Sequence, residues 1–329
     1  MTEDDLLEAI AESPNDDGPR LVYADWLQQQ ADERRRARGE YIALACTTVR
    51  PKPAARTEEL LEKYGASWLG PLVGVTRRHV WARGFVDSCE LRGYAASIDI
   101  TPALEHPEWR ALRAIYTDTN TPDPTFEQIA ELLCQRAIKN LKAARTSLQV
   151  LRLLAESAHA PRLVELQFHP WGGEGIEQLL PVLDAEFLSR LRKLHLLRCP
   201  RALLQRVIRP QLGVLAVAGP PRSLGEYLAE LVALQAPLEE LRLVSTFAGV
   251  FEQREMELVL HGKAGTWSHL EVRWSYDDHR TWREEVLATL PSLAGAIQRL
   301  SFVGPPSARF DVTRFKHRVA AALPGATVD

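Results

Sequence analysis

Histidine, cysteine, serine and acidic side chains are the residues of this chain that could do chemistry, and their spacing fits no catalytic or metal-binding motif. The nine histidines lack the HExxH spacing of a zinc site, and the four cysteines lack the CxxC spacing. His169 and His195 could approach each other on adjacent strands, yet the sequence fixes no cysteine or carboxylate beside them. Ser88 and Cys89 have no adjoining base, and no GxSxG occurs. We therefore expect no catalytic residue, no metal site, no cofactor and no enzymatic activity.

A glycine-rich loop, WGGEG at residues 171–175, lies between a predicted strand and a predicted helix. A phosphate-binding loop has that position, but this loop lacks the lysine and the spacing of either phosphate fingerprint. We interpret it as a tight turn.

Composition and charge narrow the class of protein. The 329 residues carry a formal net charge of −3 with a pI near 6.3, which gives no overall attraction to nucleic acid or to an anionic membrane. The N-terminus, MTEDDLLEAI, is acidic where a signal peptide is basic, and no apolar run approaches the length of a membrane span. We expect a cytoplasmic protein with no membrane contact, whose cysteines are reduced and mostly buried.

Three short helices are predicted at the N-terminus, over residues 2–12, 19–27 and 37–45, and together they would form a small bundle. Arg20, Asp25 and Glu40 are expected to lock these helices together through a half-buried network. A proline-rich connector at 51–55 follows, then a helix over 57–69 and a strand over 85–91. The predicted domains are a helical module at 1–50, a linker with a connecting helix at 51–83, and a repeat region at 84–329.

The run DDGPRLVYADWL at 16–27, followed by RGEYIALA at 38–45, resembles the repeat-companion domain of planctomycetes and myxobacteria, which typically precedes leucine-rich or similar repeats. The resemblance extends through YGASWLGPL at 64–72 and WARGFV at 81–86, so it covers about the first third of the chain. It implies an intracellular bacterial protein, and it brings no established activity. The connection QQQADERRRARGE departs from the family because it is longer and more basic.

A cassette of the form LxxLxL recurs through the rest of the chain. Its starting residues are Leu112, Leu163, Leu191, Leu212, Leu238, Trp267 and Ile297. Such recurrence is typical of a leucine-rich-repeat solenoid, in which each unit buries its apolar face against its neighbours. We therefore predict an α/β chain: an N-terminal helical bundle followed by an irregular leucine-rich-repeat-like solenoid of short parallel strands plus helices. Helices are expected near 126–140, 146–158, 174–183 and 224–234, and a helix over 312–323 would cap the end.

The open side of the solenoid is the predicted binding surface. Strand side chains alternate, so the residue between the two inward leucines faces outward, and so does the residue two positions on. Aromatic and arginine side chains are common interface hot spots. The predicted protein-binding patch consists of Tyr116, His169, Trp171, His195, Arg198, Arg242, Arg273 and Trp274. We expect a scaffold or adaptor, or a regulatory or immunity-type subunit, with a protein partner whose identity the sequence does not give.

The alternative function is nucleic-acid binding through an arginine-rich loop formed by Arg34, Arg35, Arg36 and Arg38. Acidic residues flank this cluster, so a solvated surface loop is the better interpretation and nucleic acid is an unlikely partner.

Overall fold

The computed structural model describes the chain in segments: residues 1–47, 55–92, 101–104, 106–117, 126–135, 138, 140–168, 176–197, 199, 203–219, 238–246, 254–263, 266–274, 280–304 and 311–328. These residues hold eleven α-helices and twelve strands, so the chain is of the mixed α/β class. It divides into two compact units, Met1–Leu163 and Val164–Asp329. The predicted domain boundaries after residues 50 and 83 both lie inside the first unit.

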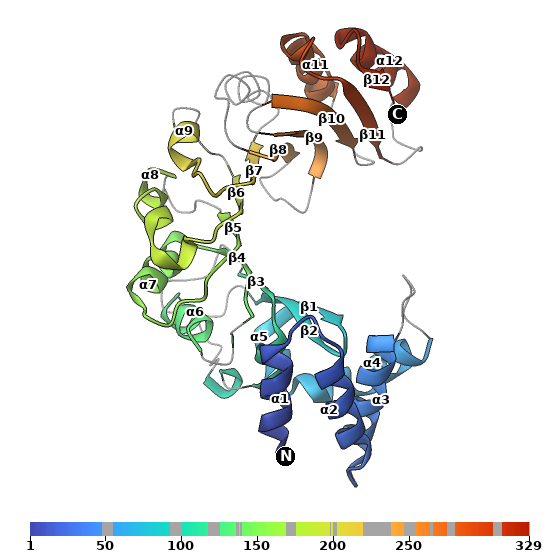
Figure 1. Ribbon diagram of the computed structural model, residues 1–329, viewed down its shortest axis with the longest axis vertical. Coiled ribbons are helices and arrows are strands. Elements are labelled where there is room, and N and C mark those ends of the chain that lie inside the picture. Colours follow the sequence, from blue (N-terminus) through green and yellow to red (C-terminus); the bar gives the residue numbers. More distant parts are fainter. Residues whose placement is uncertain are drawn as a thin grey trace. The chain divides into compact units, whose positions relative to one another are not determined.

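Four helices open the first unit (Figure 1): α1 (Glu3–Glu12), α2 (Gly18–Gln28), α3 (Glu33–Thr47) and α4 (Ala55–Leu69). The predicted helices are confirmed. Thr2 caps α1 in a reciprocal pair, because its hydroxyl accepts from the Asp5 N–H at 3.2 Å while the Asp5 carboxylate accepts from the Thr2 N–H at 2.7 Å. The helix α3 begins before the predicted Ala37, so most of the expected basic loop is helical. Its first turn is capped by Asp32, whose carboxylate accepts from the N–H groups of Arg34 and Arg35.

The expected network of Arg20, Asp25 and Glu40 does not form. Arg20 is buried and donates to the Asp16 carbonyl at 2.8 Å, whereas Asp25 is exposed. Glu40 instead pairs with Arg56 of α4 at 2.8 Å. Apolar contacts among α1, α2 and α3 hold the bundle, with Leu6, Ile10, Ala24, Leu27 and Ile42 at most 2% exposed. Asp25 lies on the side of α2 that this packing leaves in solvent.

The first unit continues with a helix and four strands: α5 (Leu72–Val75), β1 (Thr76–Ala82), β2 (Phe85–Leu91), β3 (Ala114–Tyr116) and β4 (Ala143–Thr146). The strand at 85–91 was predicted correctly. Arg83 and Gly84 turn the β1–β2 hairpin with φ of 52° and 87°, as a two-residue hairpin turn requires. Strands β2, β3 and β4 pair in parallel and in chain order.

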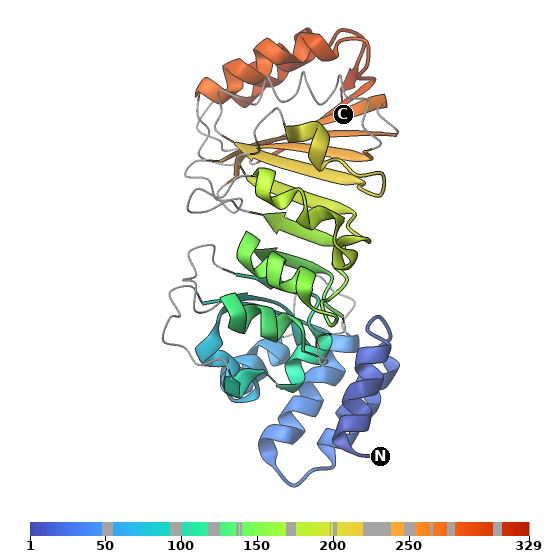
Figure 2. The ribbon, with the colours of Figure 1, turned by 90° about the vertical axis from the view of Figure 1, so that its left-hand side faces the viewer.

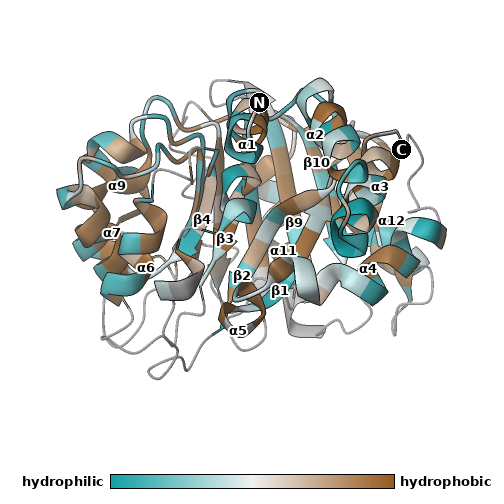
Figure 3. Ribbon diagram, turned by 90° about the horizontal axis from the view of Figure 1, so that it is seen from below, coloured by the Kyte–Doolittle hydropathy of each residue, from teal (hydrophilic) through white to brown (hydrophobic). Residues whose placement is uncertain are grey.

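Two helices accompany these strands, α6 (Phe126–Leu133) and α7 (Leu148–Glu156). Both mix hydrophobic and hydrophilic residues, as Figure 3 shows. The buried leucines are Leu132 and Leu133 of α6 and Leu148, Leu151 and Leu154 of α7. The sequence correctly predicted a helix near each. It missed β4, because the run AART has no apolar alternation to mark a strand.

The described residues of the second unit form eight strands, which pair in chain order: β5 (Glu165–Phe168), β6 (Lys193–Leu197), β7 (Val214–Gly219), β8 (Glu240–Thr246), β9 (Arg254–Lys263), β10 (Thr266–Trp274), β11 (Arg299–Val303) and β12 (Thr327–Val328). The cassette leucines align across them. Leu166, Leu194, Leu215 and Leu241 are successive partners, and each is 0% exposed.

The prediction of parallel strands alone is wrong for β9, and β1 lies where a linker with a connecting helix is predicted. Strand β9 runs antiparallel to both of its neighbours, β8 and β10. The spacing of the later cassettes predicts one strand plus one helix for each interval, including the one between Leu238 and Trp267. The alternation of Glu257, Val259 and His261 with two buried leucines instead gives a strand.

Four helices belong to the described part of the second unit: α8 (Ile176–Leu179), α9 (Leu204–Val207), α11 (Arg280–Thr289) and α12 (Val312–Ala322). Figure 2 shows α8 and α9 on one face of the neighbouring strands. The predicted terminal helix is confirmed as α12. The predicted helix after the second cassette is shorter than expected, because Pro181 interrupts it and a 3-10 turn at Val182–Asp184 follows. The helix expected at 224–234 lies outside the described residues.

Gly39 allows α2 and α3 to approach closely. A Cβ atom at this position would lie 2.5 Å from the Ala24 carbonyl oxygen, whereas a Cβ at Gly65 of α4 would only reach a Leu61 methyl at 3.7 Å. Gly39→Ala should therefore lower the free energy of unfolding by about 1–3 kcal/mol through overpacking. Gly65→Ala is the matched control and should raise it by up to about 1 kcal/mol through helix propensity. Denaturant titrations of both variants test this, and equal stabilities would contradict the close approach.

Candidate functional site

The strand register of the second unit gathers the predicted outward-facing residues into rows. Gln167, His195, Ala216 and Arg242 are successive partners from β5 to β8, and Glu271 of β10 pairs with Ser301 of β11. Val259 of the inserted strand β9 lies between the two groups. The column read from the cassettes is thus a true row of the sheet, lengthened by one strand.

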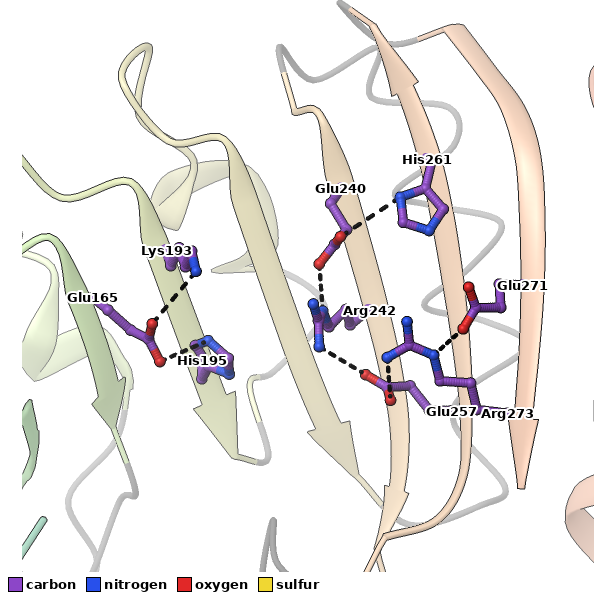
Figure 4. Close-up of polar contacts among 9 residues, drawn as sticks. All are labelled: Glu165, Lys193, His195, Glu240, Arg242, Glu257, His261, Glu271 and Arg273. Atoms are coloured by element: carbon purple, nitrogen blue, oxygen red, sulfur yellow. Dashed lines mark hydrogen bonds and ion pairs between the residues drawn. The ribbon is translucent and has the colours of Figure 1, made fainter. Parts of the chain in front are cut away.

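Two groups of charged and histidine side chains lie across these rows, on the face opposite α8 and α9 (Figure 4). We call the two groups together the polar face. It consists of Glu165, Lys193, His195, Glu240, Arg242, Glu257, His261, Glu271 and Arg273.

Glu257 is the centre of the larger group, between Arg242 and Arg273. Its two carboxylate oxygens lie 3.6 Å from Arg242 Nη1 and 3.5 Å from Arg273 Nη1. Arg242 Nε also donates to Glu240, and Arg273 Nε donates to Glu271. Glu257 is 3% exposed, whereas the side chains of Arg242 and Arg273 are 26% and 33% exposed. Both guanidinium groups are therefore held in fixed positions at the surface by a buried carboxylate.

These contacts shift the pKa values of Glu271 and Arg273. Burial raises the pKa of Glu271, but the hydrogen bond from Arg273 and the nearby charges outweigh it, so the pKa lies below the ordinary glutamate value. The hydrogen bond to Glu271 in turn raises the pKa of Arg273. A carboxylate with a lowered pKa in the folded state adds stability above its ordinary pKa, and this contribution is lost as the pH falls through the lowered value.

A second group lies at the β5–β6 end of the polar face. Glu165 is 3.5 Å from His195 Nε2 and 3.7 Å from Lys193 Nζ. The sequence fixes no carboxylate beside His195, whereas the parallel register supplies one from the neighbouring strand. Glu165 is one residue before the predicted Leu166, so the cassette pattern marks its position without showing which residue it would face.

Two histidines stack between β9 and β10. The rings of His261 and His269 are 5.1 Å apart, and His261 Nδ1 lies 3.5 Å from Glu240. His269 Nε2 is 2.8 Å from Ser301 Oγ, a distance suited to a nucleophile and its base. These residues lie in the middle of paired strands, where the ladder occupies the backbone N–H groups that an oxyanion would need. We interpret the contact as part of the polar surface.

Only part of the predicted patch lies within the described residues of the second unit. His195, Arg242 and Arg273 lie together on one face of the second unit, whereas His169, Trp171 and Arg198 lie outside the described residues. His195 is 7% exposed and is therefore less accessible than expected.

Trp274 was wrongly placed in the exposed patch. It follows Arg273 on a strand and therefore points to the opposite face, where it is 7% exposed and its ring lies 6.3 Å from that of Phe302. Tyr116 belongs to the first unit. There it pairs with Glu90 and Arg145, and the Arg145 guanidinium lies 5.4 Å from its ring centre.

The arginines proposed for nucleic-acid binding are dispersed around α3. Arg38 is 6% exposed and donates to the buried Glu108, and Arg35 pairs with Glu3 at 2.7 Å. Arg36 donates to the Gln30 and Ala31 carbonyls. Arg34 has a 66% exposed side chain, 3.8 Å from Asp32. The burial of Arg38 corrects the expectation that all four arginines face solvent.

The described residues also bear on metal sites, membrane spans and reactive cysteines. No group of three histidine, cysteine or acidic residues there is arranged to hold a metal ion. None of the described helices combines the length and apolar character needed to cross a membrane. None of the four cysteines, all of which lie in described residues, forms a disulfide, and burial raises the pKa of Cys46 to about 11 and that of Cys89 to about 12.

Comparisons with known proteins leave the family open. No protein-family model, no curated protein and no solved structure matches this chain.

Glu257→Gln should lower the free energy of unfolding by about 1–3 kcal/mol, because it keeps the shape of the side chain but leaves two guanidinium groups facing a neutral amide. Glu165→Gln is the matched control. The free energy of unfolding of this variant should fall by less than about 1 kcal/mol, because Lys193, which pairs with Glu165, has a 50% exposed side chain. Urea titrations of the two variants provide the comparison. Equal losses would mean that Glu257 does not hold the two arginines together.

Proposed function

We propose that this chain is a non-enzymatic scaffold or adaptor that binds a protein partner through the polar face of its second unit. The observation that supports this proposal is that Glu257 holds two partly accessible arginines, Arg242 and Arg273, in fixed positions. Arginine is enriched among interface hot spots, and a side chain already held in place loses less conformational entropy when a partner binds.

The charge of the polar face favours a protein over a nucleic acid. Its carboxylates nearly balance its lysine and arginines, and almost every charge has an opposite charge within 4 Å. A phosphate backbone needs an excess of basic groups, whereas a protein surface of mixed charge can match alternating acids and bases. The dispersed arginines of α3 also weaken the nucleic-acid alternative.

The proposed architecture is a helical module of the repeat-companion type followed by a leucine-rich-repeat-like solenoid. The aligned, fully buried cassette leucines support the repeat interpretation. The antiparallel strand β9 makes such a solenoid irregular. We further propose that the protein works in the cytoplasm, as a regulatory or immunity-type subunit that covers a partner enzyme.

Site-specific photocrosslinking tests the binding surface. A crosslinking residue in place of Gln167, which lies in one row with His195 and Arg242, should capture a discrete protein from the native cell lysate. The same residue at His317, an exposed position on α12, is the control. Arg242→Glu combined with Arg273→Glu should weaken capture at position 167 by about tenfold or more. Equal capture at both positions, or no effect of the charge reversal, would contradict the proposal.

The same experiment evaluates the nucleic-acid alternative. Nucleic acid recovered at low salt, released at high salt and lost after Arg34→Gln combined with Arg36→Gln would favour it. Both arginines have exposed positions on α3, so these changes leave the buried Arg38 in place.

A further inference from the structure

The first unit contains a pocket of about 300 Å³ among α1, α2, α3, α4 and the 3-10 turn at Pro107–Ala111. Its walls include the apolar side chains of Leu7, Leu27, Trp68, Phe85 and Pro107. Leu7, Leu27 and Phe85 are at most 3% exposed, whereas Arg34 and Ser67 at the margin are exposed. The pocket thus has an apolar interior and a polar opening.

Arg38 supplies a fixed, buried guanidinium to this pocket. Its Nη2 donates to Glu108, and the other oxygen of Glu108 accepts from the Val86 N–H at 2.9 Å. The guanidinium carbon lies 4.9 Å from the Trp68 ring centre and 4.8 Å from that of Trp81. Aromatic faces and one carboxylate therefore hold Arg38 rigidly.

One edge of this guanidinium keeps a donor available. Arg38 Nη1 is buried and finds no hydrogen-bond acceptor among the described residues. The same is true of Arg35 Nε. Arg35 and Arg38 are three positions apart on α3 and so lie on one face of the helix, and both line the pocket. A buried donor without an acceptor is costly, so these two groups favour a ligand that accepts hydrogen bonds.

The remaining polar groups at the pocket are occupied or are themselves donors. Glu3 accepts from Tyr23 at 2.8 Å as well as from Arg35 Nη2 at 2.7 Å, and Asp32 caps α3. Burial, aided by Arg38, lowers the pKa of His106 to about 4, so its ring is neutral near pH 7. Since His106 Nδ1 accepts from the Glu108 N–H at 3.3 Å, its proton is on Nε2. The carboxylates are thus engaged, while donors remain.

We infer that this pocket binds an organic carboxylate that carries an apolar group, with the carboxylate on Arg35 and Arg38 and the apolar group against Trp68, Leu7 and Leu27. Three arginines and three acidic residues line the pocket, so its formal charge is balanced. A single negative charge suits that balance better than the double charge of a phosphate. The ligand is either a small free acid or the C-terminal residue of a protein chain, because both present the same chemistry.

Ligand-detected NMR titration of the full chain tests the inference, with phenylacetate as the probe and phenylacetamide as its uncharged match. Phenylacetate should bind with a dissociation constant on the order of 10 mM or tighter, and the amide should bind about tenfold more weakly. A short peptide ending in phenylalanine, with a free or an amidated C-terminus, distinguishes the two sources. Tighter binding of the free peptide than of phenylacetate assigns the pocket to a chain terminus, and the reverse assigns it to a small acid.

The variants separate the pocket from general charge effects. Arg35→Met should weaken phenylacetate binding by about tenfold, because it removes one of the two donors. Arg36→Met is the matched control, since Arg36 is adjacent in sequence but does not line this pocket, and it should bind as the wild type does. Arg38→Met combined with Glu108→Gln removes both buried charges together and should abolish binding while the chain stays folded by circular dichroism.

Several results would overturn the inference. These are equal binding of the acid and its amide, tighter binding of inorganic phosphate, wild-type affinity in the Arg35→Met variant, or no saturable binding of any carboxylate probe. None of these results bears on the polar face, which lies in the other unit.

Discussion

The in-register alignment of neighbouring strands is the constraint on which the second unit depends. Because side chains alternate along a strand, one register fixes both faces of the sheet together. Leu194 and Leu215 are buried against each other only if His195 and Ala216 are also neighbours on the opposite face. A shift of one residue would expose the leucines, so apolar burial fixes the position of every charged group on the polar face.

This coupling explains which parts of the site could be predicted. The cassette pattern located the strands and identified the row through His195, Arg242, Glu271 and Ser301, because that row follows from the positions of the leucines. It could not reveal Glu257, which contacts both arginines from a strand outside the repeat. Trp274 was misplaced for a simpler reason: an aromatic residue beyond the cassette was assigned by its type, although alternation alone sends it to the core.

In the first unit, local signals were reliable and long-range pairing was not. The capping pair of Thr2 and Asp5 and the apolar spacing of α1 and α2 are short-range features, and the helices they predict are present. The contact of Arg38 with Glu108 joins residues 70 positions apart. In the sequence Arg38 reads as one more surface charge among its neighbours, and only the packing of Trp68 and Trp81 around it makes it a buried group.

The reversed strand β9 also affects how the second unit can assemble. Parallel neighbours such as β6 and β7 require a crossover before they can pair, whereas β8, β9 and β10 form an antiparallel meander from contiguous sequence. Contacts within the meander close short loops, and loop closure over short distances costs little chain entropy. Among the described strands of the second unit, the meander therefore has the lowest local contact order. Its outer strands, β8 and β10, then provide the edges with which the parallel strands β7 and β11 can pair.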